Sequence, residues 1–263
     1  MVYLIIPAYN EERNIAQLVR NTREAMSLIG LSYRIYIVND GSTDGTSRLI
    51  AELAHEAPVT EIKFDANRGV DQAFKAGFEE VFNEARPGDI IVTKEADNTS
   101  DHAILKKMIE HVLAGYDVAF ASCFAPEGRV ENSSLDRHIL SFGANALLKI
   151  FFPVKGINTY SSFYRAYDAM RIKAALKAYE GRMFEEKGFV CMVEMIVKLS
   201  RLPLKMVEVP MVLRCNKREG MSKLRRRRTI LGYLKFIKKQ ALRTRAYDRQ
   251  VRERFERFTT ASR

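Results

Sequence analysis

The chain has 263 residues, and 47% of them are hydrophobic, which is enough to bury one large core, alone or with an appendage. No stretch approaches ~18 uninterrupted apolar residues, so a membrane-spanning helix is not expected, and the apolar start "MVYLIIPAYN" lacks the basic flank of a signal peptide. Three scattered cysteines exclude a disulfide framework and a zinc site, and the expected setting is a reducing cytoplasm.

The net charge of +11 is concentrated near the C-terminus. Residues 201–263 contain 20 of the 43 lysines and arginines but only 5 of the 32 acidic residues, a net of +15, which leaves −4 for residues 1–200. The body of the protein is therefore slightly acidic. This asymmetry predicts a basic C-terminal segment that meets an anionic surface.

Short apolar runs alternate along the first half of the chain with segments whose apolar residues recur at helical spacing. This β-α-β-α order predicts an α/β fold with a mostly parallel sheet covered by helices on both faces. The expected strands cover residues 2–6, 33–38, 59–64, 89–93 and 118–121, and the expected helices cover residues 11–29, 43–53, 69–82 and 101–112.

The second half has a less regular pattern. Its last two expected helices are amphipathic and rich in basic residues. A turn and a strand are expected within "NTYSSFYRAY". The other expected elements are helices at residues 134–152, 185–200, 229–242 and 247–258 and a strand at residues 206–213.

Polar residues follow three of the expected strands, in "PAYNEE", "NDGSTDGT" and "KEADNTSD". In open sheets of this type, ligands bind at the carboxyl ends of the strands, so we expect the three segments to line one crevice. Asp40 in the second segment can accept a hydrogen bond from a nucleobase or a ribose. Taken alone, the same segment is explained equally well as a plain strand-to-helix turn in which Ser42 or Asp44 caps the next helix.

The segments "IIPAYNEERNI", "IVNDGSTDGT" and "NRGVDQAFKAGF" resemble, in order and spacing, the family 2 glycosyltransferases. This resemblance implies the GT-A fold, which is Rossmann-like, and a nucleotide-sugar donor that is bound by the first two segments. The residues expected to bind the donor are Pro7, Tyr9, Asn10, Glu11, Asp40, Lys94, Glu95, Ala96, Arg214 and Lys223.

The same resemblance places "EAD" at residues 95–97 where the family has its acidic metal motif, usually Asp-x-Asp. Glu95 and Asp97 would both turn toward a divalent cation, and their hard oxygen ligands suit Mg²⁺ or Mn²⁺. The metal would neutralise charge on the leaving diphosphate. Glutamate at position 95 departs from the family pattern, which leaves direct ligation and contact through a water both open. A solvated acidic loop is the alternative interpretation.

The second half resembles the dolichyl-phosphate mannosyltransferase branch of the family in "RHILSFGANALLKIFF", "GFVCMVEMIVKLSRLPLKMVEVP" and "GMSKL". By this match, Arg137 and Ser141 would bind the phosphate of a polyprenyl-phosphate acceptor, since residues four apart share one face of a helix. Arg214 and Lys223 would contact the diphosphate of the donor. The branch normally has arginine where Cys123 stands.

The nature of the acceptor decides whether a catalytic base is needed. A phosphate monoester is largely ionised at neutral pH and needs no general base, whereas a sugar hydroxyl would need a carboxylate from the second half. Glu194 is the candidate for that role, and a buried structural role explains it equally well.

The segment "KLRRRRTILGYLKFIKK" combines consecutive arginines with aliphatic and aromatic residues. Such a basic amphipathic helix is typical of an anchor on anionic lipid, at roughly 1 kcal/mol for each basic residue near the surface. A core or dimer helix with a solvated basic face is the alternative. No nucleic-acid-binding motif is found, so nucleic acid is not expected as a partner.

Together these observations predict an inverting, metal-dependent glycosyltransferase that moves a hexose, with mannose from GDP-mannose as the leading choice, to a polyprenyl or dolichyl phosphate. A UDP-sugar enzyme with another acceptor and a non-catalytic nucleotide-binding relic remain alternatives. The expected domains are residues 1–224 (1–122 for the donor and 123–224 for the acceptor) and a helical tail at 225–263. The expected location is the cytoplasmic face of a membrane, with peripheral attachment.

Overall fold

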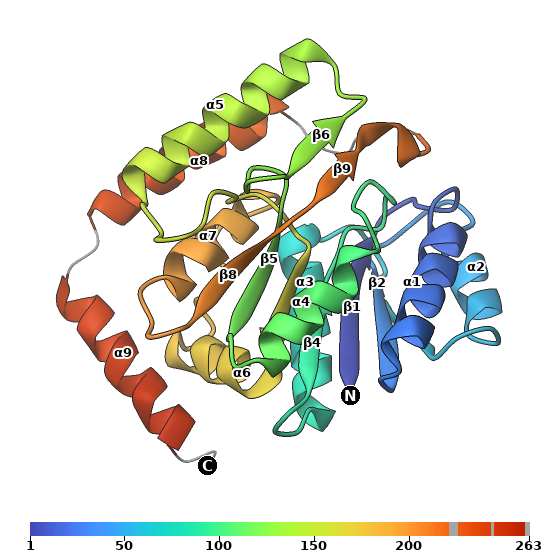
Figure 1. Cartoon of the computed structure of the whole chain (residues 1–263), viewed down its shortest axis with the longest axis horizontal. Coiled ribbons are helices and arrows are strands. Elements are labelled where there is room, and N and C mark those ends of the chain that lie inside the picture. The colour runs from blue at the N-terminus through green and yellow to red at the C-terminus, as the bar shows by residue number, and fades with distance from the viewer. Residues whose placement is uncertain (221–225, 243–244, 261–263) are drawn as a thin grey trace.

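A seven-stranded sheet, strand order β3-β2-β1-β4-β7-β5-β8, forms the centre of the computed structural model (Figure 1). The structure describes residues 1–220, 226–242 and 245–260, without the side chains of residues 135–140, 226–228 and 241. The strands are β1 Val2–Ala8, β2 Tyr33–Asn39, β3 Val59–Lys63, β4 Ile90–Thr93, β5 Val118–Ser122, β7 Arg165–Asp168 and β8 Met206–Pro210. The helices are α1 Ile15–Ile29, α2 Thr46–Leu53, α3 Val70–Glu84, α4 Ile104–Leu113, α5 Leu135–Phe151, α6 Ala169–Ala178, α7 Val190–Leu199, α8 Arg226–Ala241 and α9 Arg245–Thr260.

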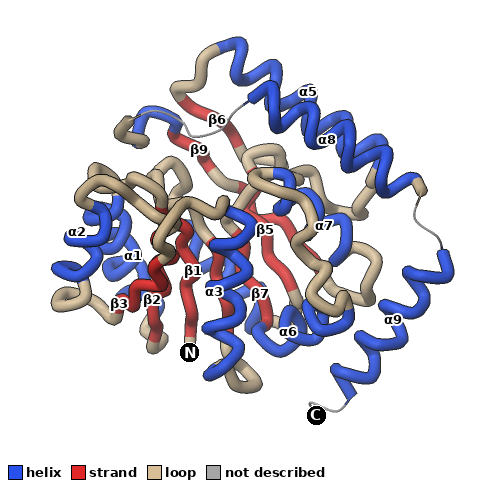
Figure 2. The backbone as a smooth tube through the Cα atoms, turned by 180° about the vertical axis from the view of Figure 1, so that it is seen from behind, coloured by secondary structure: helices blue, strands red, loops and turns tan. Residues whose placement is uncertain are grey.

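Side-chain alternation along the strands separates two cores, one on each face of the sheet. In β1, Tyr3 and Ile5 point to one face, and Leu4 and Ile6 point to the other. Helices α1, α2 and α4 cover the second face, while α3, α6 and α7 cover the first, which is the face seen in Figure 2. The predicted α/β architecture with a mostly parallel sheet is confirmed.

Strand β7 makes the sheet mixed, because it runs antiparallel to both β4 and β5. The sequence predicted a strand here without its direction. The expected single strand at 206–213 is two strands: β8 pairs with β5 up to Pro210, and β9 (Val212–Arg214) pairs with β6 (Arg129–Glu131) in a separate two-stranded sheet. Proline has no N–H for the ladder, so the change of partner falls at Pro210.

Helices α8 and α9 pack onto the body and contribute to its core. Tyr233 and Phe236 of α8 are buried in the same cluster as Val251 and Phe255 of α9. Figure 1 shows α8 beside α5 along one edge of the molecule, with α9 following it toward α6. No helix in the described part of the chain combines the length and apolarity that crossing a bilayer requires.

Candidate active site

A cavity of about 1570 Å³ opens at the carboxyl ends of β1, β2 and β4. It extends from these strand ends to side chains of α5 and α8. The expectation that three polar segments converge on one crevice is therefore met. The predicted site residues that line it are Pro7, Tyr9, Asn10, Glu11, Asp40, Lys94, Glu95, Ala96, Asp97 and Ser141.

The loops after β1 and β2 are joined by hydrogen bonds between backbone and side chains. The Asn10 N–H donates to Ser42 Oγ at 2.9 Å, and the Thr43 N–H donates to Asn10 Oδ1 at 2.8 Å. The Glu11 N–H donates to Thr46 Oγ1 at 2.9 Å. Asn10 adopts a φ of 52°, a conformation that asparagine tolerates better than most residues. The two loops thus form one preformed wall of the crevice.

Asp40 organises the turn that precedes α3. Its carboxylate accepts from the Arg68 N–H at 2.7 Å, the Gly69 N–H at 2.9 Å and Asn67 Nδ2 at 3.0 Å. Burial raises the pKa of Asp40, and the two backbone N–H groups oppose that rise. Asp40 therefore lines the crevice, and its carboxylate holds residues 67–69 at the edge of the crevice.

Glu95 and Asp97 follow β4 with their carboxylates already hydrogen-bonded. Glu95 accepts from the Phe163 N–H and from Ser100 Oγ, each at 3.2 Å. Asp97 Oδ1 accepts from Thr99 Oγ1 at 2.7 Å. Phe163 reaches this site because its chain continues into β7, which runs antiparallel beside β4. The sequence did not reveal this contact.

The two acids supply the oxygen donors that Mg²⁺ or Mn²⁺ prefers, but they do not form a complete metal site alone. Within the described residues, no group of three or more His, Cys, Asp or Glu side chains could hold a metal ion. The remaining oxygen of Asp97, Oδ2, forms an ion pair with Arg218 Nη2. The acid pair therefore fits a divalent ion only if other ligands complete the shell and Arg218 withdraws.

Lys94 lies fully buried directly before the acid pair. Its Nζ donates to the Ser100 carbonyl at 3.3 Å and lies 4.4 Å from the centre of the Tyr164 ring. Burial lowers the pKa of Lys94 to about 7, and the nearby charges of Glu95 and Asp101 oppose the shift. With this pKa, Lys94 changes between its charged and neutral forms near neutral pH.

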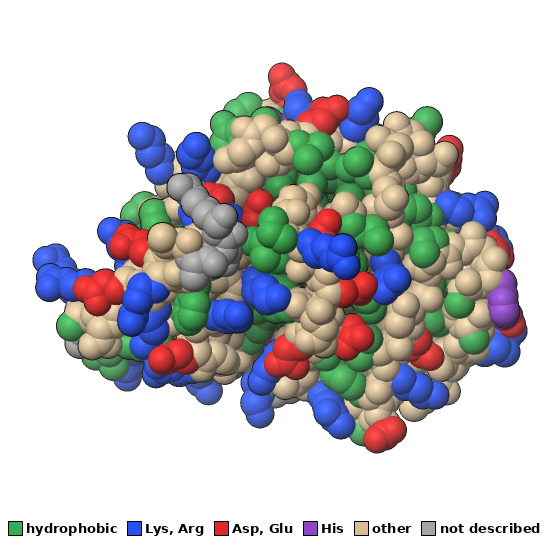
Figure 3. All heavy atoms as spheres, turned by 90° about the horizontal axis from the view of Figure 1, so that it is seen from below, with side chains coloured by type: hydrophobic (Ala, Val, Ile, Leu, Met, Phe, Trp, Pro, Cys, Tyr) green, Lys and Arg blue, Asp and Glu red, His purple; other side chains and the backbone are tan. Residues whose placement is uncertain are grey.

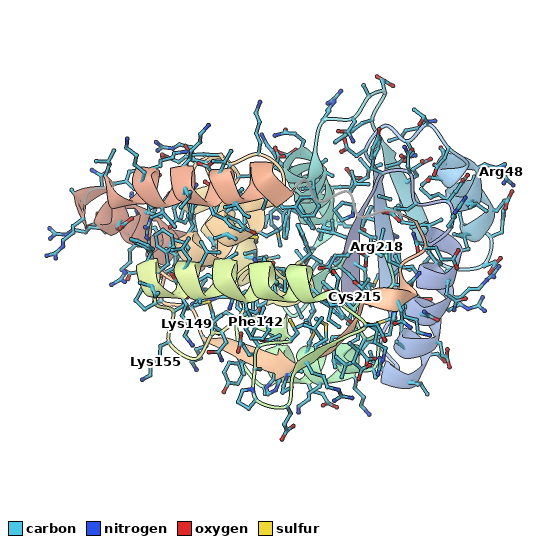
Figure 4. The ribbon with its side chains drawn as sticks, turned by 90° about the horizontal axis from the view of Figure 1, so that it is seen from above. Arg48, Phe142, Lys149, Lys155, Cys215 and Arg218 are labelled. Atoms are coloured by element: carbon cyan, nitrogen blue, oxygen red, sulfur yellow. The ribbon has the colours of Figure 1, made fainter. Side chains whose placement is uncertain are left out.

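The segment after β9 crosses the crevice at its rim. Arg214 does not line the cavity; its guanidinium pairs with Asp101 at 2.9 Å and with Glu131 at 3.4 Å. Arg218 does line it, and Figure 4 shows Arg218 and Cys215 near the strand ends, with Phe142 along α5. Lys223 and the side chain of Arg137 lie outside the described part of the structure.

The candidate general bases lie away from the cavity. Glu194 is fully buried, bonded to Lys198 Nζ and to the N–H groups of Glu185 and Glu186, which assigns it a structural position. Among the described side chains, no histidine lines the cavity. Burial lowers the pKa of His102 to about 3, so this imidazole is neutral at physiological pH.

Comparison with known proteins places these observations in a family. The family described as glycosyl transferase family 2 matches residues 3–179. A dolichol-phosphate mannosyltransferase of Pyrococcus furiosus is 32% identical over 90% of this chain, which spans 62% of that protein. A polyprenol monophosphomannose synthase of Mycolicibacterium smegmatis is 30% identical, over 84% of this chain and 80% of that protein.

Solved structures show the same fold at lower sequence identity. A glucosyl-3-phosphoglycerate synthase of Mycobacterium tuberculosis, crystallised with Mn²⁺, uridine diphosphate and phosphoglyceric acid, superposes with a TM-score of 0.61 at 16% identity. The match covers 90% of this chain and 78% of that one. At this identity the likeness establishes the fold alone.

Proposed function

The chain belongs to glycosyl transferase family 2, and on this premise we propose that it transfers a hexose from a nucleotide-sugar to a polyprenyl phosphate with inversion. Mannose from GDP-mannose is the leading donor, because two relatives that cover 90% and 84% of the chain are named for mannose transfer to polyprenol-type phosphates. The observation that carries the proposal is the convergence of three strand-end segments, with the pair Glu95 and Asp97, on one crevice.

The donor half of the crevice would bind the nucleotide and its diphosphate. Residues 7–11 and Asp40 would bind the nucleoside. Lys94 and Ala96 would lie beneath the diphosphate. Arg214 and Lys223 would approach the diphosphate from the rim of the crevice. Glu95 and Asp97 would hold Mg²⁺ or Mn²⁺, whose charge when bound stabilises the leaving diphosphate. Residues 1–224 would form this catalytic unit, with α8 packed against it and lining part of the cavity.

The acceptor half would present a phosphate oxygen to the anomeric carbon. Arg137 and Ser141 of α5 would bind the acceptor phosphate, which attacks from the face opposite the nucleotide. The new bond joins the phosphate oxygen to the anomeric carbon as the bond to the diphosphate breaks, and the nucleoside diphosphate leaves. No proton has to be removed from an ionised phosphate, which agrees with the buried, structural position of Glu194.

A membrane surface would supply the acceptor lipid. Apolar side chains are exposed on the two helices that border the cavity, among them Phe142 and Ile150 of α5 and Leu231 and Leu234 of α8. Lys235 and Lys238 lie on α8 among them. Figure 3 shows the molecule from below, and on that face Lys and Arg side chains are interspersed with Asp and Glu side chains. We infer that the edge formed by α5 and α8 attaches the enzyme peripherally to the cytoplasmic face of an anionic membrane.

The direct test is transfer by the purified protein. Incubation with a panel of nucleotide-sugars, Mn²⁺ and a short polyprenyl phosphate should give a lipid product heavier by one hexose, detected by mass spectrometry. Asp97→Asn should reduce the rate by at least 10²-fold, whereas Glu110→Gln on the exposed face of α4 should leave it unchanged. Absence of product with every donor would refute the proposal.

Two alternatives give different results in the same set of measurements. A UDP-sugar donor is the first alternative, and the panel separates it from GDP-mannose by the donor consumed. A non-catalytic relic would bind nucleotide equally well with and without Mn²⁺ and would be indifferent to Asp97→Asn.

A further inference from the structure

Arg218 contacts one member of the acid pair. Its Nη2 pairs with Asp97 Oδ2, and its side chain is 19% exposed. Glu11 and Glu95 act on the same guanidinium through their charges. Within the described residues, Nη1 is buried and has no hydrogen-bond partner. One carboxylate therefore contacts the guanidinium and two more act on it through their charges, while one of its nitrogens lacks a hydrogen-bond partner.

The segment carrying Arg218 is fixed at both ends to the crevice loops. At one end, the Arg214 N–H donates to the Thr99 carbonyl at 2.8 Å. At the other, the Glu219 N–H donates to Asn14 Oδ1 at 3.0 Å, and Asn14 Nδ2 donates to the Glu219 carbonyl at 2.9 Å. Asn14 is itself buried and also donates to Glu11 Oε2 at 2.7 Å. The reciprocal pair between Asn14 and Glu219 holds Arg218 over Asp97.

We propose that Arg218 is a built-in counter-cation that excludes a divalent ion from Glu95 and Asp97 until residues 215–220 move away, with the contact between Asn14 and Glu219 as the latch. The proposal rests on the metal dependence given under the proposed function. A guanidinium and a metal ion cannot both take Asp97 Oδ2, because their like charges would repel at the short distance that this shared oxygen imposes. Metal binding and Arg218 docking are therefore mutually exclusive.

This arrangement makes metal entry depend on the donor. A metal ion alone has to break the Arg218–Asp97 ion pair and the latch, and it gains only two protein carboxylates as ligands. A metal ion that arrives with a nucleoside diphosphate brings additional oxygen ligands, and the freed guanidinium can pair with the diphosphate charge. The protein should therefore bind Mn²⁺ weakly by itself and strongly with a nucleoside diphosphate, while the acids remain compensated in the empty enzyme.

Mn²⁺ titration without nucleotide, followed by the electron paramagnetic resonance signal of free Mn²⁺, tests the exclusion. Arg218→Gln should bind Mn²⁺ at least tenfold more tightly than the wild type, and Asn14→Ala several-fold more tightly. Lys217→Gln is the matched control, since Lys217 lies on the same segment, is exposed and carries the same charge. Its Mn²⁺ affinity should stay within twofold of the wild type.

Equal Mn²⁺ affinity of Arg218→Gln and Lys217→Gln would overturn the exclusion and leave metal-dependent transfer intact. Failure of every variant to bind Mn²⁺, even with nucleoside diphosphate, would overturn the metal role as well. Hydrogen exchange on the wild type provides a test that needs no variant. Mn²⁺ with nucleoside diphosphate should speed exchange at the Glu219 amide, and unchanged protection there would contradict the latch.

Discussion

Lys94 combines two features that oppose each other: complete burial and a position among carboxylates. Only the Ser100 carbonyl accepts a hydrogen bond from Nζ among the described contacts, and the face of Tyr164 covers it. The free-energy cost of burying the ammonium group exceeds the gain from Glu95 and Asp101, which is why the pKa of Lys94 falls to about 7.

The lowered pKa of Lys94 predicts how stability depends on pH. Between pH 7 and about 10, the unfolded chain binds a proton at Lys94 that the folded protein does not, so the wild type gains stability as pH rises. Lys94→Met removes this term. The free energy of unfolding of wild type minus variant should therefore rise between pH 7 and 9.5, by at most about 1.4 kcal/mol per pH unit, and stay flat below pH 6.

Urea unfolding at pH 5.5, 7, 8 and 9.5 measures this difference. Lys107→Met, which removes an exposed lysine of α4, is the control and should track the wild type at every pH. A difference between wild type and Lys94→Met that does not change with pH would show that Lys94 titrates at its ordinary value.

Residues that act through distant contacts could not be predicted from the sequence. The strand-end segments identified Glu95, Asp97 and Asp40 because the position of a residue after a strand follows from local pattern. Glu219 and Asn14 meet across a separation of 205 residues, and no local pattern encodes such a pair. The contact of Arg218 with Asp97, on which the proposed exclusion of a metal ion rests, was therefore not expected.

At the scale of elements, the segment between α6 and α7 is held by a buried ion pair within α7. Glu194 and Lys198 are both fully buried and one helical turn apart, and Glu194 Oε2 accepts from the N–H groups of Glu185 and Glu186 at 2.8 Å each. Lys239 of α8 pairs with Glu186 at 2.9 Å. The Glu194–Lys198 pair therefore fixes residues 185 and 186, which line the crevice, and the Lys239–Glu186 pair joins α8 to that wall.

Breaking the pair should destabilise the protein strongly. Glu194→Gln removes the fully buried counter-charge of Lys198 and leaves it the partly exposed Glu185, at 2.8 Å, so the expected cost in urea unfolding is about 3 kcal/mol, at the lower end of the range for a broken buried pair. The double variant Glu194→Gln/Lys198→Met should recover much of that loss, because no unpaired buried charge remains. Glu180→Gln, which removes an exposed charge, should cost at most about 1 kcal/mol. Unchanged stability with lost transfer in Glu194→Gln would instead indicate a catalytic acid or base.

The pattern of elements was predictable where apolar periodicity was strong. The strands before residue 122 and helices α1 to α5 begin and end within a few residues of their expected limits. Helix α6 was missed, because its core side chains are mostly alanine, as in Ala174, Ala175 and Ala178, and contrast little with their neighbours. The antiparallel direction of β7 depends on long-range pairing, and local pattern does not contain it.

At the scale of the whole molecule, charge and apolar exposure are unevenly distributed. The segment from residue 201 onward carries +15, and α8 from this segment lies beside α5, whose outer residues include Ile150 at 75% exposure and Phe151 at 54%. Apolar side chains that are exposed on adjacent helices mark interaction sites in soluble proteins. The cavity reaches the same two helices, so it connects this edge of the molecule with the acid pair.

Membrane attachment through this edge predicts a specific response to substitution. The double variant Leu231→Ser/Leu234→Ser should lose at least tenfold in partition onto vesicles that contain anionic lipid, because two exposed leucines no longer enter the interface. Leu28→Ser/Leu113→Ser, on α1 and α4, removes leucines that are even more exposed elsewhere and should bind as the wild type does. Binding of the wild type should weaken with rising salt and with neutral lipid, since basic residues contribute part of the attraction. Equal loss in both double variants would assign the binding to general hydrophobicity, and no loss in either would place the membrane contact on another face.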